Sequence, residues 1–343
     1  MDNPRAERVK RVAALATRAG RRKQGLFLAE GPQPVREALR LWLARYDAAC
    51  GEQLPPAKLP ELDALYFTCE TLEQHPGLSA LLDQIRGVLF DPQATLPRHA
   101  RIFLREATPE VLTAMSDADA PQGIIAVCRT PEAVKSPNSS LEVLSGAGTL
   151  QSSGSETGGR PRPWAADLKN PDALGPEPTI RLGAALVGLQ DPGNVGTLIR
   201  TADAAGAGVV VLTPGTADPW SPKVVRAAAG SHFHLPVLTG VSLGELVECR
   251  EPVGFQVLAA HGYAALPLAE LTDPGYTGSG PNLGQPTVWL LGNEAHGLSA
   301  DELSYADAAV SVPLYGQAES LNVAAAGAVC LYASAMAQRS GRP

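Results

Sequence analysis

The residues best suited to chemistry lie in three short stretches of the second half of this chain. In each stretch an apolar run gives way to polar residues, at positions 184–200, 288–297 and 312–328. Amides, carboxylates and hydroxyls in such turns can bind and orient a substrate, and an arginine adds a permanent positive charge. The candidate catalytic residues are Asn194, Arg200, Glu294, Ser320 and Asn322.

The first stretch predicts a strand, a tight turn, a helix and a second strand over residues 184–212. The sequence DPGN, which ends at Asn194, consists of residue types that strongly favour a tight turn. Asn194 and Arg200 are six residues apart, about 240° on a helix after whole turns, so they share a face only if Asn194 still belongs to the turn. A dinucleotide-binding turn does not fit, because Gly193 and Gly196 lack the Gly-x-Gly-x-x-Gly spacing and no acidic residue closes the second strand.

All three stretches follow predicted strands of a parallel sheet. Continuous apolar runs are typical of strands that are buried on both faces. These runs lie at residues 184–189, 209–212, 255–260 and 287–291. Helical patterns at 194–205 and 222–229 separate them, and Ser221 is the predicted N-cap of the second helix. Ligands of such sheets gather at the carboxyl ends of the strands, where the polar residues stand.

The first 130 residues predict a separate, small α/β domain, because strand-like and helical runs alternate along them. The predicted strands are residues 26–29, 64–68, 88–90 and 124–127, and the predicted helices are residues 34–44 and 78–85. Between residues 131 and 179 the composition changes to Ser, Gly and Pro. This change predicts a flexible linker or insertion before a second domain at residues 180–340.

The composition is typical of a soluble globular protein. A chain of 343 residues with 45% hydrophobic and 18% charged residues can form two cores and is not largely disordered. No apolar run has membrane-spanning length and no signal-peptide core is present, so we expect a cytoplasmic protein without a membrane anchor. The five cysteines and six histidines show no ligand spacing, so neither a disulfide framework nor a metal site is indicated.

Charge is distributed unevenly along the chain. The net charge is −7, yet residues 1–23 hold eight Lys and Arg against two acidic residues, a local balance of +6. Such a segment can bind phosphates by releasing counterions, or it can be the solvated face of a helix. Its candidate phosphate-binding residues are Arg11, Arg18, Arg21, Arg22 and Lys23.

In their order, the three stretches resemble the motifs of the SpoU/TrmH family of S-adenosylmethionine-dependent RNA ribose 2′-O-methyltransferases, within the SPOUT superfamily. The resemblance covers roughly residues 184–338, apart from a loop near Gly275. The segment FLAEG at residues 27–31 is similar to part of the family's substrate-binding domain, which resembles ribosomal protein L30e. The resemblance implies an α/β protein with a C-terminal parallel-sheet trefoil-knot (SPOUT) domain preceded by a small L30e-like α/β domain that binds RNA.

The resemblance also assigns the binding of S-adenosylmethionine largely to main-chain groups of the knot. Glycine at positions 292 and 297 lets the backbone approach a ligand, and apolar side chains can sandwich an adenine. From the residues alone, Leu291, Val312 and Leu321 are equally well explained as ordinary core. The cofactor-binding residues that the resemblance implies are Leu291, Gly292, Val312, Leu314 and Leu321.

By the same resemblance Arg200 activates the attacking ribose hydroxyl, with the other four polar residues around it. A guanidinium holds its proton strongly, which makes it an awkward base. Arg200 can instead bind the adjacent phosphate and stabilise the developing alkoxide, with Glu294 orienting it. Glu294 as a surface turn residue and Ser320 as a helix N-cap are the alternatives.

Several alternatives stay open at this stage. The small residues 324–328 are consistent with the homodimer of the family, and core packing within one subunit is the simpler explanation. Ribosomal RNA is favoured as the substrate by analogy with family members that have a separate RNA-binding domain, and transfer RNA is the alternative. A catalytically inactive RNA-binding or ribosome-assembly factor with the same fold is the competing function.

Overall fold

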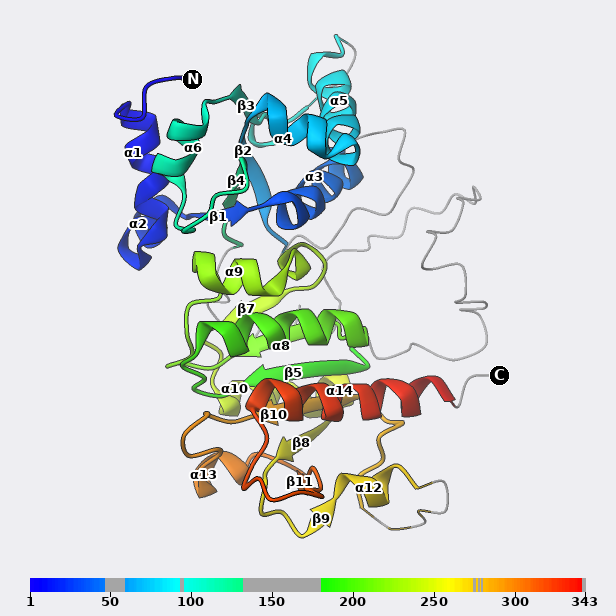
Figure 1. Cartoon of the computed structure of the whole chain (residues 1–343). Helices are drawn as coiled ribbons and strands as arrows, with labels where there is room; N and C mark the ends of the chain where they lie inside the picture. Colours follow the sequence, from blue (N-terminus) through cyan, green and yellow to red (C-terminus); the bar gives the residue numbers. More distant parts are fainter. Residues whose placement is uncertain are drawn as a thin grey trace, which may run out of the picture.

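The computed structural model describes residues 1–46, 59–92, 96–131, 180–273, 276, 278 and 280–340. Two β-sheets, each covered by helices, lie one above the other (Figure 1). The predicted linker, residues 131–179, falls outside the described residues except for residue 131. One sheet is built from residues 26–129 and the other from residues 182–311, on either side of that segment.

The N-terminal sheet has four strands in the order β1-β4-β2-β3. β4 is antiparallel to β1 and β2, and β3 is parallel to β2. The strands are β1 (Leu26–Glu30), β2 (Glu61–Phe67), β3 (Phe103–Glu106) and β4 (Ile124–Arg129). The predicted α/β character is confirmed, but residues 88–90, predicted as a strand, form the end of a helix, and β3 was not predicted.

Helices cover both faces of the N-terminal sheet (Figure 1). One face carries α1 (Glu7–Ala13), α2 (Arg18–Gln24) and α6 (Pro109–Met115), and the other carries α3 (Pro32–Tyr46), α4 (Cys69–Gln74) and α5 (Pro76–Phe90). Alternate strand residues enter the two layers, since Phe27 and Ala29 belong to one core and Leu28 to the other. This is the two-faced burial expected of a small α/β domain.

The C-terminal sheet has seven strands in the order β7-β6-β5-β10-β8-β11-β9. Every neighbouring pair is parallel, as predicted. The strands are β5 (Leu182–Leu186), β6 (Val209–Leu212), β7 (Val237–Thr239), β8 (Gln256–Ala260), β9 (Leu266–Pro267), β10 (Thr287–Leu291) and β11 (Ala308–Ser311). Since all strands are parallel, the turns that follow them lie along one edge of the sheet.

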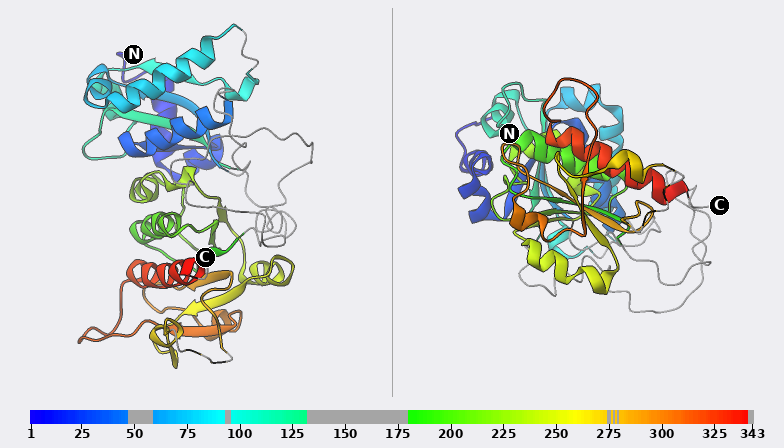
Figure 2. Two further views of the ribbon diagram at one scale, coloured as in Figure 1. Left: turned by 90° about the vertical axis from the view of Figure 1, so that its right-hand side faces the viewer. Right: turned by 90° about the horizontal axis from the view of Figure 1, so that it is seen from below.

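Helices flank this sheet on both faces (Figure 2). One face packs against α8 (Pro192–Ala205), α9 (Pro222–Ala228), α12 (Leu268–Leu271) and α14 (Val323–Ser340), and the other against α10 (Leu243–Glu248), α11 (Arg250–Val253) and α13 (Ala300–Leu303). In β10, Trp289 and Leu291 belong to the first layer, whereas Val288 and Leu290 belong to the second. Continuous apolar strands therefore do reflect burial on two sides.

α8 and α14 run side by side in the same direction. Asn322 is hydrogen-bonded to Asn194 at their beginnings, and Arg339 Nη1 donates to Ala205 O at their ends. A Cβ added to Gly327 would lie 2.5 Å from Leu198 Cδ2, so the glycine lets the two helices approach closely. Gly327 thus serves packing within one subunit, the simpler of the two explanations for residues 324–328.

The two domains share an apolar interface. Val225 and Phe233 of the C-terminal domain belong to the core cluster of the N-terminal domain. Phe27 lies 5.0 Å from Trp220 and 6.3 Å from Phe233, measured between ring centroids. Arg226 adds an ion pair across the boundary to Glu30 at 3.5 Å. The contacts fix the N-terminal domain against the C-terminal sheet.

His234 adds a charged contact to this interface. Its imidazole lies 2.7 Å from Asp203 Oδ2 and 3.4 Å from Glu37 Oε2, a carboxylate of the N-terminal domain whose side chain is only 6% exposed. The hydrogen bonds to Asp203 and then to Glu37 outweigh partial burial and raise the pKa of His234 to about 9. The imidazolium therefore bridges two carboxylates at neutral pH.

Some local predictions were only partly right. Ser221 is the N-cap residue of α9, with Pro222 in the first turn, but its hydroxyl makes no capping hydrogen bond and is buried without a partner in the described structure. Three of the four described cysteines are buried, which agrees with a core-filling role. Among the described residues no helix is both long and apolar enough to cross a membrane.

Candidate functional site

The three predicted stretches meet at the carboxyl edge of the C-terminal sheet. From β5 the chain proceeds outward to β6 and β7, whereas β10, the neighbour of β5 on its other side, is followed by β11 on the far side of β8. The order of the strands thus reverses between β5 and β10, which is where open parallel sheets bind their ligands. The turns after these two strands contain residues 187–194 and 292–299.

The Glu294 carboxylate joins these two turns. Oε2 accepts a hydrogen bond from Gln190 N at 3.1 Å, and Oε1 accepts from Asp191 N at 3.1 Å and from Asn194 Nδ2 at 3.2 Å. Partial burial opposes ionisation of Glu294, but the hydrogen bonds, led by that from Gln190, outweigh it and lower the pKa. Glu294 is therefore an anion that holds the turn, rather than a proton carrier near neutral pH.

Asn194 and Asn322 extend this connection to the third stretch. Asn322 Nδ2 donates to Asn194 Oδ1 at 3.1 Å. The Oδ1 of Asn322 in turn accepts from the backbone N–H of Ala324 at 2.9 Å, in the first turn of α14. Hydrogen bonds therefore run from Glu294 through Asn194 to Asn322, and we call these three residues the motif junction.

Asn194 lies in the first turn of α8, not before it. Asp191 is the N-cap residue, and its Oδ1 accepts from Asn194 N at 2.9 Å. Arg200 follows on the same helix, so the two side chains leave α8 in different directions. Arg200 is exposed, and within the described residues it makes no hydrogen bond or ion pair to the motif junction. Ser320 is likewise exposed and is not joined to these residues.

The backbone is folded tightly at Gly292. A Cβ at this position would lie 2.6 Å from Gly297 C and 2.7 Å from Leu298 N, both backbone atoms. Gly297 has φ +67°, a left-handed conformation that favours glycine. Asn293 closes the same turn, because its Nδ2 donates to Gly188 O at 2.8 Å and its carbonyl accepts from Gly297 N at 2.9 Å.

The other candidate cofactor residues differ in exposure. Leu291 is fully buried, and its side chain belongs to the core. Val312 is partly buried against the same core, whereas Leu314 and Leu321 are each 41% exposed. A buried glycine turn and exposed apolar side chains on the third stretch are parts that suit a ligand with a flat apolar part and polar edges.

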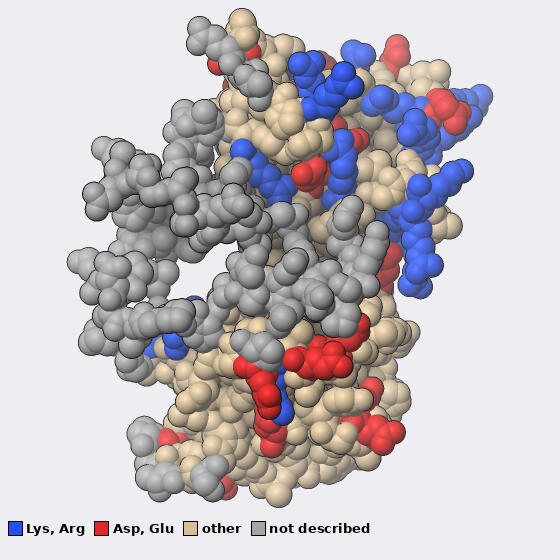
Figure 3. Space-filling view, turned by 180° about the vertical axis from the view of Figure 1, so that it is seen from behind, with Lys and Arg blue, Asp and Glu red and all other residues tan. Residues whose placement is uncertain are grey.

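The basic residues of the N-terminal segment lie on the N-terminal domain, where Lys and Arg gather on the face shown in Figure 3. Arg11, Arg18, Arg22 and Lys23 are exposed. Arg21 is only 6% exposed, and its Nη2 lies 2.6 Å from Asp218 Oδ2 of the C-terminal domain. Its Nη1 donates to two backbone carbonyls of the N-terminal domain. Arg21 therefore connects the domains, and its guanidinium is not free for a ligand.

Sequence reasoning missed three residues that build this site: Gln190, Asp191 and Asn293. Asp191 was noticed only as turn chemistry, although an Asp before Pro at a helix start is an N-cap signal. Asn293 stands between two assigned residues, Gly292 and Glu294, and was given no role. Gln190 takes part through its backbone N–H, for which its side-chain type carries no signal.

Two family models match this chain. Residues 181–332 match the SpoU rRNA Methylase family, and residues 6–126 match the MRM3-like substrate binding domain. The C-terminal domain is therefore a SpoU methylase domain. The N-terminal domain is an MRM3-like substrate-binding domain, which confirms the two-part resemblance seen in the sequence.

Individual relatives support this assignment. The 23S rRNA (guanosine(2553)-2′-O)-methyltransferase RlmP of Bacillus subtilis is 41% identical over 154 residues, or 45% of this chain, and the chain spans 58% of the length of that relative. A crystal structure of an RNA 2′-O ribose methyltransferase is 26% identical, with a TM-score of 0.63 over 99% of both chains. A S-adenosylmethionine-bound rRNA methyltransferase of Sinorhizobium meliloti, 23% identical with a TM-score of 0.66, covers all of this chain and 98% of its own and shows the fold alone.

Proposed function

We propose that this protein transfers a methyl group from S-adenosylmethionine to a ribose 2′-hydroxyl in RNA, and that the RNA is ribosomal. The observation that carries the proposal is the motif junction, in which hydrogen bonds link Glu294, Asn194 and Asn322 at the strand-order reversal, beside the tight backbone at Gly292. A SpoU methylase domain whose polar side chains assemble at the carboxyl edge of the sheet supports an enzymatic function.

S-adenosylmethionine, when bound, supplies an electrophilic methyl group on a sulfonium centre. We propose that main-chain groups at Leu291 and Gly292 bind it, since the side chain of Leu291 is buried and Gly292 has none. The partly exposed Val312, Leu314 and Leu321 would then cover its apolar part. The close backbone contact at Gly292 is consistent with such a site, because a side chain there would fill the turn.

We propose that Arg200 acts through its charge and not as a base. The ribose oxygen must be held in line with the methyl group, and an arginine that binds the neighbouring phosphate both positions the ribose and stabilises the developing alkoxide. The carboxylate of Glu294 and the amide of Asn194 fix the turn at the start of α8. This turn sets the direction of the helix that carries Arg200. Ser320 and Asn322 complete the proposed catalytic set on the third stretch.

An Arg200→Lys variant tests this role, since lysine keeps the charge but loses the fork of donors that matches a phosphate. We expect kcat to fall by about 100-fold, the usual effect of removing one such electrostatic contact. Turnover close to that of the native protein at neutral pH would contradict phosphate recognition by Arg200.

The direct test of the activity is incubation with S-adenosylmethionine labelled in the methyl group and with total RNA. We expect label on a ribose of ribosomal RNA, mapped as a primer-extension stop. Label on transfer RNA would support the alternative substrate, and label on a base would reject the proposal. A competing proposal is an inactive RNA-binding or ribosome-assembly factor, which predicts no heat on titration with S-adenosylmethionine. The assembled polar junction favours the enzyme.

We further propose that the protein is a homodimer that pairs through α14. Val329, Tyr332 and Met336 are 44%, 43% and 60% exposed, and their spacing places them on one face of this helix. Arg200 is exposed on the neighbouring α8. An apolar face on a helix whose other side is already packed fits a second copy of the chain. Sedimentation should give a dimer, and Met336→Glu should give a monomer.

Three finer expectations stay proposals. The strand order places β10 between β5 and β8, after which the chain forms β11 and returns to pack α14 against α8, a path that supports the trefoil knot. The RNA-binding role is proposed for the exposed Arg11, Arg18, Arg22 and Lys23, without the buried Arg21. A cytoplasmic location, expected from the sequence, remains a prediction.

A further inference from the structure

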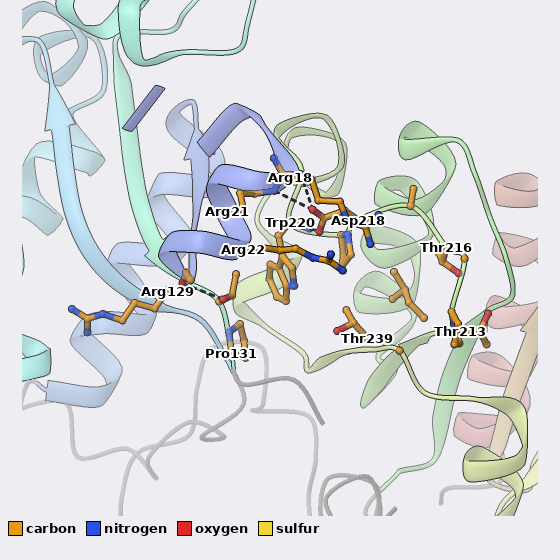
Figure 4. A pocket seen from close by; sticks show the side chains of 18 of the residues that line it. Arg18, Arg21, Arg22, Arg129, Pro131, Thr213, Thr216, Asp218, Trp220 and Thr239 are labelled. Carbon is orange, nitrogen blue, oxygen red and sulfur yellow. Dashed lines mark hydrogen bonds and ion pairs between the residues drawn. The ribbon is translucent and has the colours of Figure 1, made fainter. Parts of the chain in front are cut away.

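A cavity of about 810 Å³ lies between the two domains. Its floor is the loop after β6, residues 213–220, together with the residues that follow β7, at the same carboxyl edge of the sheet as the motif junction. Its other wall is α2, from which Arg18 and Arg22 reach toward the loop that carries Asp218 and Trp220 (Figure 4).

The cations around this cavity are not equivalent. Arg21 is held by Asp218. Arg129 is held by Asp63 and Glu61 and points away from the loop (Figure 4). Arg18 and Arg22 are exposed, four residues apart on α2, and have no ion-pair partner within the described part of the chain. Two free guanidinium groups therefore face the cavity from one side of a helix.

Trp220 gives the cavity an aromatic wall. Its indole packs against Phe27 at 5.0 Å and against His232 at 5.2 Å, between ring centroids, and it remains partly exposed among the lining residues. His232 is buried, which lowers its pKa to about 4 and keeps it neutral. A fixed aromatic side chain beside free arginines is the combination with which proteins bind single-stranded nucleic acid, by stacking bases and pairing phosphates.

The cavity is connected to the motif junction through hydrogen bonds. Ala217 N donates to Leu189 O at 2.8 Å, and Gly188 N donates to the hydroxyl of Thr213 at 3.1 Å. The side chain of Gln190 donates to Gly215 O in the same loop, while its backbone N–H binds Glu294. The cavity floor and the turn that begins α8 are thus one hydrogen-bonded structure.

We propose that this interdomain cavity binds unpaired nucleotides of the RNA that flank the target nucleotide, with phosphates on Arg18 and Arg22 and a base against Trp220. This inference rests on the proposed function, since it takes RNA as the substrate. A cavity of this size is in the range that encloses a small molecule, so it admits one or two nucleotides and excludes an RNA helix. The RNA strand then runs along the carboxyl edge from the cavity to the motif junction.

The experiment measures binding of the full chain to fluorescein-labelled poly(U) at several salt concentrations, which does not require methyl transfer. The test protein carries both Arg18→Ala and Arg22→Ala. The control is Lys10→Ala, which removes a 64% exposed positive charge from the same N-terminal segment, outside the cavity lining. A thermal melt checks that the double variant is folded.

We expect the double variant to bind poly(U) at least about tenfold more weakly, and the logarithmic salt dependence to fall by about 0.7 for each phosphate that an arginine no longer neutralises. The Lys10→Ala variant should change the affinity less than about twofold. Equal effects of the two changes would overturn the proposal, as would an unchanged affinity in the folded double variant. Displacement of poly(U) by a poly(A)·poly(U) duplex as readily as by unlabelled poly(U) would overturn the single-strand assignment. A native protein that binds poly(U) but methylates no RNA would instead reject the proposed function.

Discussion

Replacement of Glu294 by glutamine should uncouple the motif junction while changing the shape of the side chain little. Glutamine offers one oxygen where Glu294 offers two, so its NH2 group must face either the N–H of Gln190 or those of both Asp191 and Asn194. At least one donor then loses its acceptor, and the remaining hydrogen bonds lose the assistance of the negative charge. Because Glu294 is exposed, we expect a loss of stability of only about 1 kcal/mol.

The effect on catalysis should be larger than the effect on stability. The turn at residues 190–194 sets the start of α8, and a displacement of about 1 Å at a reacting group can lower the rate by about 100-fold. We therefore expect kcat to fall by about 100-fold in a methyl-transfer assay at saturating S-adenosylmethionine. A thermal melt should show a fall of only a few degrees.

Glu302→Gln is the matched control for this change. Glu302 also accepts hydrogen bonds at a turn, from the backbone N–H and hydroxyl of Ser299 at 2.8 Å, but it caps α13 and does not touch the motif junction. It should lose similar stability and keep its turnover. Equal turnover in the two variants would refute a positioning role for Glu294. The pH dependence of turnover gives a second test. The lowered pKa of Glu294 leaves it ionised near neutral pH. A fall in turnover on the acidic side of neutral pH that is absent in Glu294→Gln would therefore identify Glu294 as a base and refute the positioning role.

Two further predictions concern packing and pH. Gly292→Ala should lower the free energy of unfolding, measured by chemical denaturation, by roughly 1–3 kcal/mol, because the added Cβ would meet backbone atoms. In the control Gly316→Ala the added Cβ has nothing within 4 Å, so this change should be neutral. Equal stability of the two variants would contradict the close contact at Gly292. The pKa of His234 is raised to about 9. The contribution of this histidine to the free energy of unfolding is therefore complete below pH 6.5 and is lost as the pH rises through about 9. We expect this loss to be ~1 kcal/mol after allowing for a side chain that is 42% exposed, and a His234→Gln variant whose stability falls just as steeply over that range would contradict it.

Four of the seven C-terminal strands were predicted, because strands that are buried on both faces form continuous apolar runs in the sequence. Residues 209–212 and 287–291 were predicted at their observed bounds, since each is a continuous apolar run between turn residues. The N-terminal domain was harder. Residues 88–90 look like a strand but continue the helix that begins at Pro76, and Phe103–Glu106 escaped notice because it is a short strand at the sheet edge with only two apolar residues.

The candidate site shows the same division between local and distant information. The polar residues of the motif junction were predicted by resemblance, and the hydrogen bonds among Asn194, Glu294 and Asn322 join residues 100 and 128 positions apart. Charge alone could not separate Arg21 from Arg22, because the partner that buries Arg21 is Asp218, 197 positions away. Sequence pattern indicates which residue types are available, but only tertiary contact shows which of them remain free.

The apolar interface between the domains has one more consequence. Because Val225 and Phe233 are part of the N-terminal core, the substrate-binding domain packs directly against the C-terminal domain. If the proposed function is correct, an RNA bound to the N-terminal domain is held at a fixed distance from the motif junction. We then expect the enzyme to select a ribose by its distance from this anchor and not by the identity of its base.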